Sequence, residues 1–95
     1  MLSEHKPQHV GGTVVPRICA LTLDFARMMV NHPASVSIQS AATDTGVSLT
    51  LRIAEVDLYR FIGHKGRTVS ALRTVLAAIG AKERMTIKLT VEAIE

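Results

Sequence analysis

The chain has 95 residues, of which 47% are hydrophobic, and its formal net charge is +3. This length suits one domain with a single modest core and is too short for two. We expect a cytoplasmic protein, because the sequence has neither an apolar signal-peptide core nor the roughly 18 consecutive apolar residues that a membrane span needs. Residues 1–46 hold three basic and three acidic residues, and residues 47–95 hold eight and five, so the positive excess lies in the second half.

A segment of irregular composition precedes the first regular pattern. Residues 1–15 show no apolar period, so we expect a disordered tail there and one domain over residues 16–95. From Pro16, which suits a first helical turn, apolar residues recur at steps of three and four and predict an amphipathic helix up to Asn31. Its apolar face consists of Ile18, Leu21, Phe25 and Met28. Met28 and Met29 are expected to fill the core or an interface.

A β-hairpin is predicted after this helix. Residues 34–40 alternate weakly between apolar and polar side chains, and residues 47–53 alternate strictly. Thr43-Asp44-Thr45-Gly46 between them has the composition of a tight turn.

Two helices and a final strand complete the pattern. Glu55 to Ile62 predicts a short helix that Gly63 ends, and a second amphipathic helix runs from Arg67 to a C-terminal cap at Gly80. Residues 85–92 then alternate as a strand. The order helix, strand, strand, helix, helix, strand predicts an α+β fold in which three helices cover one face of a three-stranded sheet.

The segment Gly63-His64-Lys65-Gly66 between the two helices carries the functional prediction. A connection this short must turn sharply, and its glycines leave the backbone open to an approaching molecule. The amide groups that begin the next helix favour a phosphodiester, and Lys65 and Arg67 add positive charge. Ile62 is expected to form part of a groove floor beneath the bases. A plain helix-to-helix turn is the structural alternative.

The run from Leu51 to Thr68 resembles the core of small bacterial KH proteins of the KhpA type, also called YlqC-like, and the resemblance extends over about residues 16–95. It implies a type II KH domain (α-β-β-α-α-β), single-stranded RNA as ligand, and a homodimer or a larger KH-domain partner protein. The strand-gripping residues that it implies are Ile62, Gly63, His64, Lys65, Gly66 and Arg67. Tyr59, where the family has a small residue, and His64, where a second basic residue is common, depart from the pattern.

Further basic and polar residues are weaker candidates for RNA contact. Arg60, Ser70 and Arg73 lie on the polar sides of their helices and are expected to extend the phosphate track. The resemblance places Lys82, Arg84 and Lys88 opposite the loop. A solvated basic edge is the alternative explanation for Lys82, Arg84 and Lys88.

The favoured function is an RNA chaperone or post-transcriptional regulatory adaptor. The chain has three aromatic residues, too few for a stacking platform of the RRM or cold-shock kind. We find no catalytic constellation, so we expect no enzyme, and we expect neither a metal nor a cofactor. Two alternatives remain open: a protein-interaction or dimerisation module on a KH scaffold, and binding of single-stranded DNA.

Overall fold

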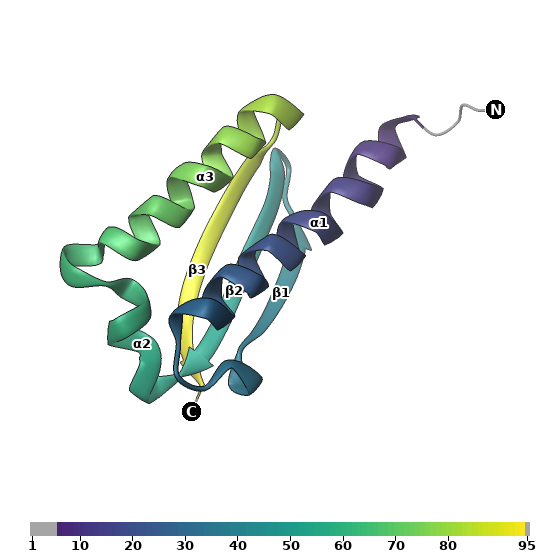
Figure 1. The fold of residues 1–95 in the computed structure, drawn as a ribbon. Coiled ribbons are helices and arrows are strands. Elements are labelled where there is room, and N and C mark those ends of the chain that lie inside the picture. Colours follow the sequence, from purple (N-terminus) through teal and green to yellow (C-terminus); the bar gives the residue numbers. More distant parts are fainter. Residues whose placement is uncertain (1–5, 95) are drawn as a thin grey trace.

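The structure, a computed structural model, describes the backbone of residues 6–94 and the side chains of residues 13–94. Three helices cover one face of a three-stranded sheet (Figure 1), which confirms the predicted α+β fold. The elements in chain order are helix α1 (Lys6–Met29), the 3-10 turn η1 (Pro33–Ser35), strands β1 (Ser37–Ala42) and β2 (Gly46–Ala54), helix α2 (Glu55–Ile62), the 3-10 turn η2 (His64–Gly66), helix α3 (Arg67–Glu83) and strand β3 (Thr86–Ile94).

The sheet has the strand order β1-β2-β3, with one antiparallel and one parallel pair. The hairpin turn between β1 and β2 is closed by the Thr43 N–H, which donates to the Gly46 carbonyl at 2.9 Å. Strands β2 and β3 run parallel, and parallel neighbours must be joined by a crossover connection. That crossover is α2, η2 and α3, so the glycine loop lies at its midpoint, away from the sheet (Figure 1).

The central strand β2 carries the core. Val47, Leu49, Leu51 and Ile53 are buried towards the helices, and Leu89 of β3 is buried beside them. Each fully buried aliphatic side chain of this kind contributes about 1.5–3 kcal/mol. The strict alternation in β2 therefore identified the buried face of the sheet correctly.

Helix α1 begins well before the residue at which the sequence analysis placed its start. Residues 6–15, expected to belong to a disordered tail, form its first turns, and Pro16 lies inside it. Val14 and Val15 pack against the core, which stabilises the helix N-terminal to the proline. The expectation for residues 1–5 lies outside the described residues. Although α1 has 24 residues, no helix in the described chain is long and apolar enough to cross a membrane.

The buried face of α1 agrees with the predicted one at Ile18, which is buried, and at Phe25, which packs against the core, but it differs at Leu21 and Met28. Thr22 and Ala26 are fully buried, whereas Leu21 is 41% exposed and Met28 is 84% exposed. Met28 is thus not a core residue, and Met29 lies at the margin with 36% exposure. Thr22 is satisfied in the core because its hydroxyl donates to the Ile18 carbonyl at 2.9 Å. Small side chains, which the hydrophobic period does not register, let this helix approach the sheet closely.

Helix α3 ends at Glu83 rather than at Gly80. Its cap is Arg84, which is in the left-handed conformation with φ 58°. Gly80 is buried inside the helix, and a Cβ there would lie 2.4 Å from the Met85 carbonyl oxygen. This glycine is therefore needed for the close return of the chain into β3 and not for a helix cap.

Candidate functional site

The loop between α2 and α3 is a tight reversal stabilised by its own backbone. The Gly63 N–H donates to the Tyr59 carbonyl, and the Gly66 N–H donates to the Gly63 carbonyl, both at 3.0 Å. Gly63, Lys65 and Gly66 all have positive φ, of 85°, 56° and 74°. A lysine in the left-handed region is uncommon and strained, and such strain is frequent where backbone approaches a ligand. The loop is thus more constrained than a plain connection requires.

Glycine suits positions 63 and 66 for different structural reasons. A Cβ on Gly63 would lie 2.4 Å from the Thr68 hydroxyl oxygen and 2.9 Å from the Thr68 backbone nitrogen. Gly63 therefore allows the loop to fold against the first turn of α3. At Gly66 a Cβ would meet nothing within 4 Å. Its missing side chain leaves the surface beside the start of α3 open, which suits the approach of a phosphodiester.

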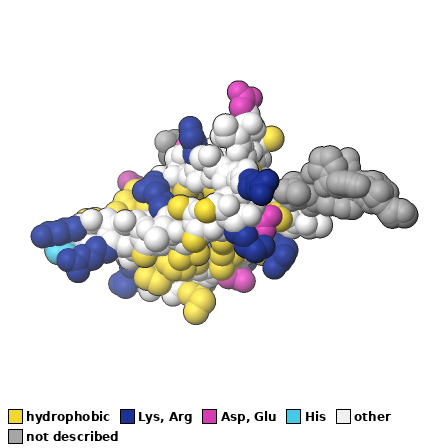
Figure 2. All heavy atoms as spheres, turned by 90° about the horizontal axis from the view of Figure 1, so that it is seen from above, with side chains coloured by type: hydrophobic (Ala, Val, Ile, Leu, Met, Phe, Trp, Pro, Cys, Tyr) yellow, Lys and Arg dark blue, Asp and Glu magenta, His cyan; other side chains and the backbone are white. Residues whose placement is uncertain are grey.

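Positive charge is concentrated at this open surface. His64, Lys65 and Arg67 are all exposed, and Lys and Arg side chains gather with a histidine at the end of the molecule where α2 meets α3 (Figure 2). No side chain caps the N-terminus of α3. The basic side chains and the positive end of the helix dipole therefore act in the same direction, towards an anion.

Among the weaker candidates, Arg60, Ser70 and Arg73 lie within reach of the loop. Arg60 and Ser70 are exposed, on the last turn of α2 and the first turn of α3. Arg73 is already engaged, because its guanidinium donates to the Leu89 carbonyl of β3 at 2.9 Å. Strand β3 is an edge of the sheet, so Arg73 joins α3 to this edge by a hydrogen bond to a backbone carbonyl of the strand. Ile62 is half-buried against the core.

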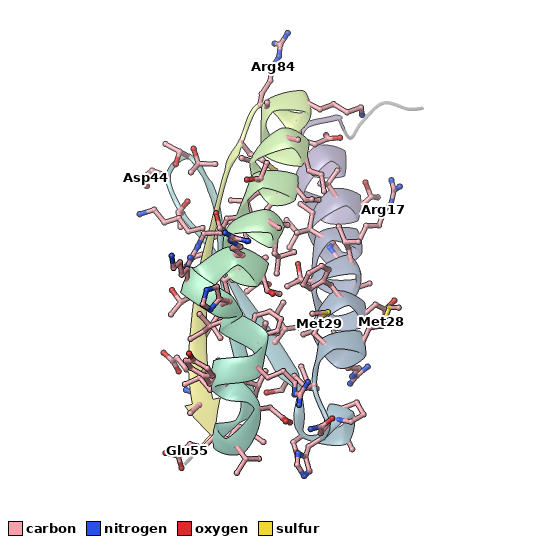
Figure 3. All side chains as sticks on the ribbon, turned by 60° about the vertical axis from the view of Figure 1, so that its left-hand side comes forward. Arg17, Met28, Met29, Asp44, Glu55 and Arg84 are labelled. Carbon is pink, nitrogen blue, oxygen red and sulfur yellow. The ribbon has the colours of Figure 1, made fainter. Side chains whose placement is uncertain are left out.

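The remaining basic candidates are not brought to the loop. Lys82 and Arg84 lie at the far end of α3, and Lys82 is paired with Glu83 at 3.2 Å. A helix of 17 residues is about 25 Å long, so these charges are remote from Lys65. Figure 3 shows Arg84 at one end of the crossover and Glu55 at the other. Lys88 alternates with the buried Leu89 and therefore lies on the sheet face away from the helices.

The carboxylates lie at the opposite end of α2 from the basic loop. Glu55, Glu92, Ala93 and Ile94 line a hollow of about 630 Å³ between the start of α2 and the end of β3. Glu92 is paired with Arg52 at 3.2 Å across the sheet surface. Along the side of α2 that faces β3, the charge therefore changes from positive at the loop to negative at Glu55. This distribution favours binding of an anionic chain at the loop end.

Asp57 has a structural role that the sequence does not reveal. Its side chain is buried, with 1% exposure, and accepts hydrogen bonds from the backbone N–H groups of Asn31 and His32 at 3.2 and 3.0 Å. Burial by itself raises the pKa of Asp57, but the hydrogen bonds from the His32 ring and from the two backbone groups outweigh it and lower that pKa. The partners of Asp57 follow α1 and lie 25 and 26 positions away in the sequence, so no local pattern indicates this role.

Two further features bear on chemistry. Among the side chains of residues 13–94, no three His, Cys, Asp or Glu are placed to hold a metal ion. Tyr59, noted above as a departure from the family pattern, is 79% exposed one helical turn before the loop. Phe25 and Phe61, in contrast, pack edge to face with ring centroids 6.2 Å apart, and Phe61 is fully buried.

Comparison with known proteins gives one family. The model of the KhpA/KhpB KH domain matches residues 20–91. "RNA-binding protein KhpA" of Listeria monocytogenes is 35% identical over 71 residues, covering 75% of this chain and 93% of the relative. The protein of the same name from Streptomyces coelicolor is 41% identical over 54 residues, covering 57% of this chain and 68% of the relative.

A solved structure supports the fold. Era, crystallised in complex with MgGDPNP and nucleotides 1506–1542 of 16S ribosomal RNA, superposes with a TM-score of 0.57 at 13% identity. The superposition covers 81% of this chain and 30% of the Era chain, and at this identity it shows the fold alone. The family match, which includes the glycine loop and both helices around it, shows that this chain belongs to the KhpA/KhpB KH-domain family.

Proposed function

We propose that this chain binds single-stranded RNA and that the loop Gly63–Gly66 with Ile62 and Arg67 grips the RNA backbone. The observation that carries the proposal is the strained loop, open beside Gly66 and flanked by exposed basic side chains at the uncapped start of α3. KH loops of this kind clamp about four backbone nucleotides. The relatives named RNA-binding protein KhpA support RNA as the ligand.

The biological role follows from this binding mode. A backbone grip without base-reading side chains is sequence-tolerant, which suits an RNA chaperone or a post-transcriptional regulatory adaptor acting in the cytoplasm. The function is binding and not catalysis. Arg60 and Ser70 are proposed to extend the track. Arg73 is proposed to contribute less, because its guanidinium already donates to the Leu89 carbonyl, whereas Lys82, Arg84 and Lys88 are too far away or face away from the loop.

The test is an anisotropy titration of labelled single-stranded RNA and matching DNA at two salt concentrations. We expect the double variant His64→Asp, Lys65→Asp to lose binding and its salt dependence, because each phosphate contact contributes about one unit to the salt slope. Equal affinity of the folded double variant and the wild type would refute the loop assignment. Tighter binding of DNA than of RNA would favour the single-stranded DNA alternative, because no 2′-hydroxyl contact would then be needed.

A matched control is present in the chain. Lys65 and Arg84 are both exposed, basic and left-handed, with φ 56° and 58°, at opposite ends of α3. Lys65→Asp and Arg84→Asp therefore make the same change in charge in the same backbone conformation. Only Lys65→Asp is expected to weaken RNA binding. Equal losses would indicate a general effect of net charge.

Self-association is a second candidate function, favoured by apolar side chains on the helical face. Leu21 and Val75 are 41% and 47% exposed, and a hollow of about 410 Å³ lies between α1 and α3. We propose a second copy of this chain as the occupant, and a larger KH-domain protein as a further partner of the same surface. Light scattering across micromolar concentrations tests the homodimer. A species of 10.3 kDa at every concentration would exclude it.

A further inference from the structure

Tyr59 is exposed beside the loop although the fold offers a core to aromatic side chains. The other two aromatic residues of the chain, Phe25 and Phe61, pack against each other, whereas Tyr59 is 79% exposed and Val56, one turn earlier, is 76% exposed. An exposed tyrosine contributes nothing to the core. Its flat ring is a surface on which a nucleobase can stack, because every base has a π-face.

The ring lines a hollow that is distinct from the side of α2 facing β3. This hollow, of about 460 Å³, is lined by Asn31, Val56, Tyr59, Arg60, Gly63 and His64. No residue of β3 contributes to it, and Asn31 of the α1 end does. It therefore lies across α2 from the hollow that Glu55 and Glu92 share with β3.

The hollow is continuous with the loop. Gly63 and His64 belong to both, and the Gly63 N–H donates to the Tyr59 carbonyl at 3.0 Å, which fixes the turn bearing the ring relative to the loop. A single-stranded RNA that crosses the loop and continues towards Asn31 passes over this hollow. The next base then lies within reach of the tyrosine ring.

We propose that Tyr59, with Arg60 and His64, forms an additional nucleotide subsite that stacks one base of a single-stranded RNA outside the stretch held by the glycine loop. The subsite rests on the proposed RNA binding and deepens it, because it predicts a longer footprint than the loop alone requires. Arg60 and Asn31 both line this hollow, so the guanidinium can contact the sugar-phosphate backbone of this nucleotide and the side-chain carboxamide of Asn31 can contact the edge of its base.

The charge of the hollow favours RNA over a protein partner. Arg60 and His64 are its ionisable side chains besides Tyr59, and no carboxylate lines it. Among the described side chains, those of residues 13–94, neither Arg60 nor His64 makes an ion pair. An unpaired guanidinium beside an exposed aromatic ring is the combination that single-strand binding surfaces use, with the cation on the backbone and the ring on the base.

The experiment compares RNAs of four and eight nucleotides with the wild type, Tyr59→Ala and Tyr59→Phe. Stacking on one aromatic ring corresponds to about a fivefold or greater change in affinity. We expect Tyr59→Ala to lose about fivefold on the longer RNA and little on the shorter one, and Tyr59→Phe to bind both like the wild type. Met28→Ala, at an equally exposed apolar residue of α1, is the control and should change neither.

A second readout reports on this one residue. The chain contains one tyrosine and no tryptophan, so its tyrosine fluorescence comes from Tyr59 alone. Stacking should quench this emission more with the longer RNA. Unchanged affinity of Tyr59→Ala for both RNAs overturns the subsite, and so does an equal loss on both, which would place the ring in the loop site itself.

The remaining outcomes distinguish failure of the Tyr59 subsite from failure of the proposed RNA binding by the loop. If Tyr59→Ala changes the molecular mass in light scattering but not RNA affinity, the surface binds protein and the subsite is wrong. If the wild type binds the shorter RNA and Lys65→Asp abolishes that binding while Tyr59→Ala has no effect on either RNA, the proposed function stands and the subsite fails. Absence of RNA binding by the wild type at both lengths overturns both.

Discussion

The carboxylate of Asp57 joins the start of α2 to the end of α1 through His32. One oxygen accepts hydrogen bonds from the His32 backbone N–H at 3.0 Å and from the His32 ring nitrogen Nδ1 at 2.9 Å, and the other oxygen accepts from the Asn31 N–H. Because the glycine loop follows directly on α2, this buried acid sets the position from which the loop is presented. It is a positioning residue and does not itself face the proposed RNA site.

Acid should weaken this anchor. The pKa of Asp57 is lowered in the folded state, so its contribution to stability is fully present above the ordinary value of 3.8 and is lost as the pH falls through the lowered pKa. We expect the urea midpoint to fall in that acid range. In Asp57→Asn the corresponding part of the acid dependence should disappear, and the melting temperature at neutral pH should fall by several degrees. An unaltered acid profile in the variant would contradict this role.

Gly63 and Gly66 should differ in their tolerance of a side chain. Gly63→Ala places a methyl group against Thr68 in a backbone region almost reserved for glycine and should cost about 3 kcal/mol. Gly66→Ala meets open space and retains only the left-handed strain, about 1 kcal/mol. Urea denaturation measures both values. Equal costs would show that the contact with Thr68 is relieved by local movement.

The sequence predicted β2 and α2 well because their patterns are strict, whereas the weakly alternating residues 34–40 only partly overlap β1 (Ser37–Ala42) and α3 continues beyond the predicted end at Gly80. The alternation of residues 47–53 and the short helix ending at Gly63 correspond to the structure without adjustment. It predicted α1 less well. Residues 1–15 show no apolar period and Pro16 suits a first helical turn, whereas the helix begins before Pro16, and Leu21 and Met28 of the predicted apolar face are exposed.

The site shows the same division between local and distant information. The glycine loop is contiguous in the sequence, so its residues could be named in advance. Asp57 accepts hydrogen bonds from residues 25 and 26 positions away in the sequence, and Arg73 donates to Leu89, which is 16 positions away. Only the fold brings these residues together. The remoteness of Lys82 and Arg84 from the loop likewise depends on the length of α3 and not on any local pattern.

The orientation of α1 is testable by a pair of substitutions. Ala26 is fully buried against the sheet, so Ala26→Leu should overpack this contact and cost about 1–3 kcal/mol. Met28→Ala removes a side chain that is 84% exposed and should change stability by less than about 0.5 kcal/mol. Chemical denaturation measures the free energy of unfolding of both variants. If the helix face predicted from the sequence were the buried one, Met28→Ala would show the larger loss.

Arg73 should contribute more to structure than to the RNA grip. Its guanidinium donates to the Leu89 carbonyl on the edge strand, so Arg73→Met removes a charge-assisted hydrogen bond and should cost about 1.5 kcal/mol. Because the charge is already committed to β3, the loss of RNA affinity should be smaller than for Lys65→Asp, which changes a residue of the loop itself. Measuring stability by urea denaturation and affinity by anisotropy on the same preparations separates the two effects. If Arg73→Met has unchanged stability and binds RNA as weakly as Lys65→Asp, Arg73 is a phosphate-binding residue. RNA would then displace the hydrogen bond from Arg73 to the Leu89 carbonyl.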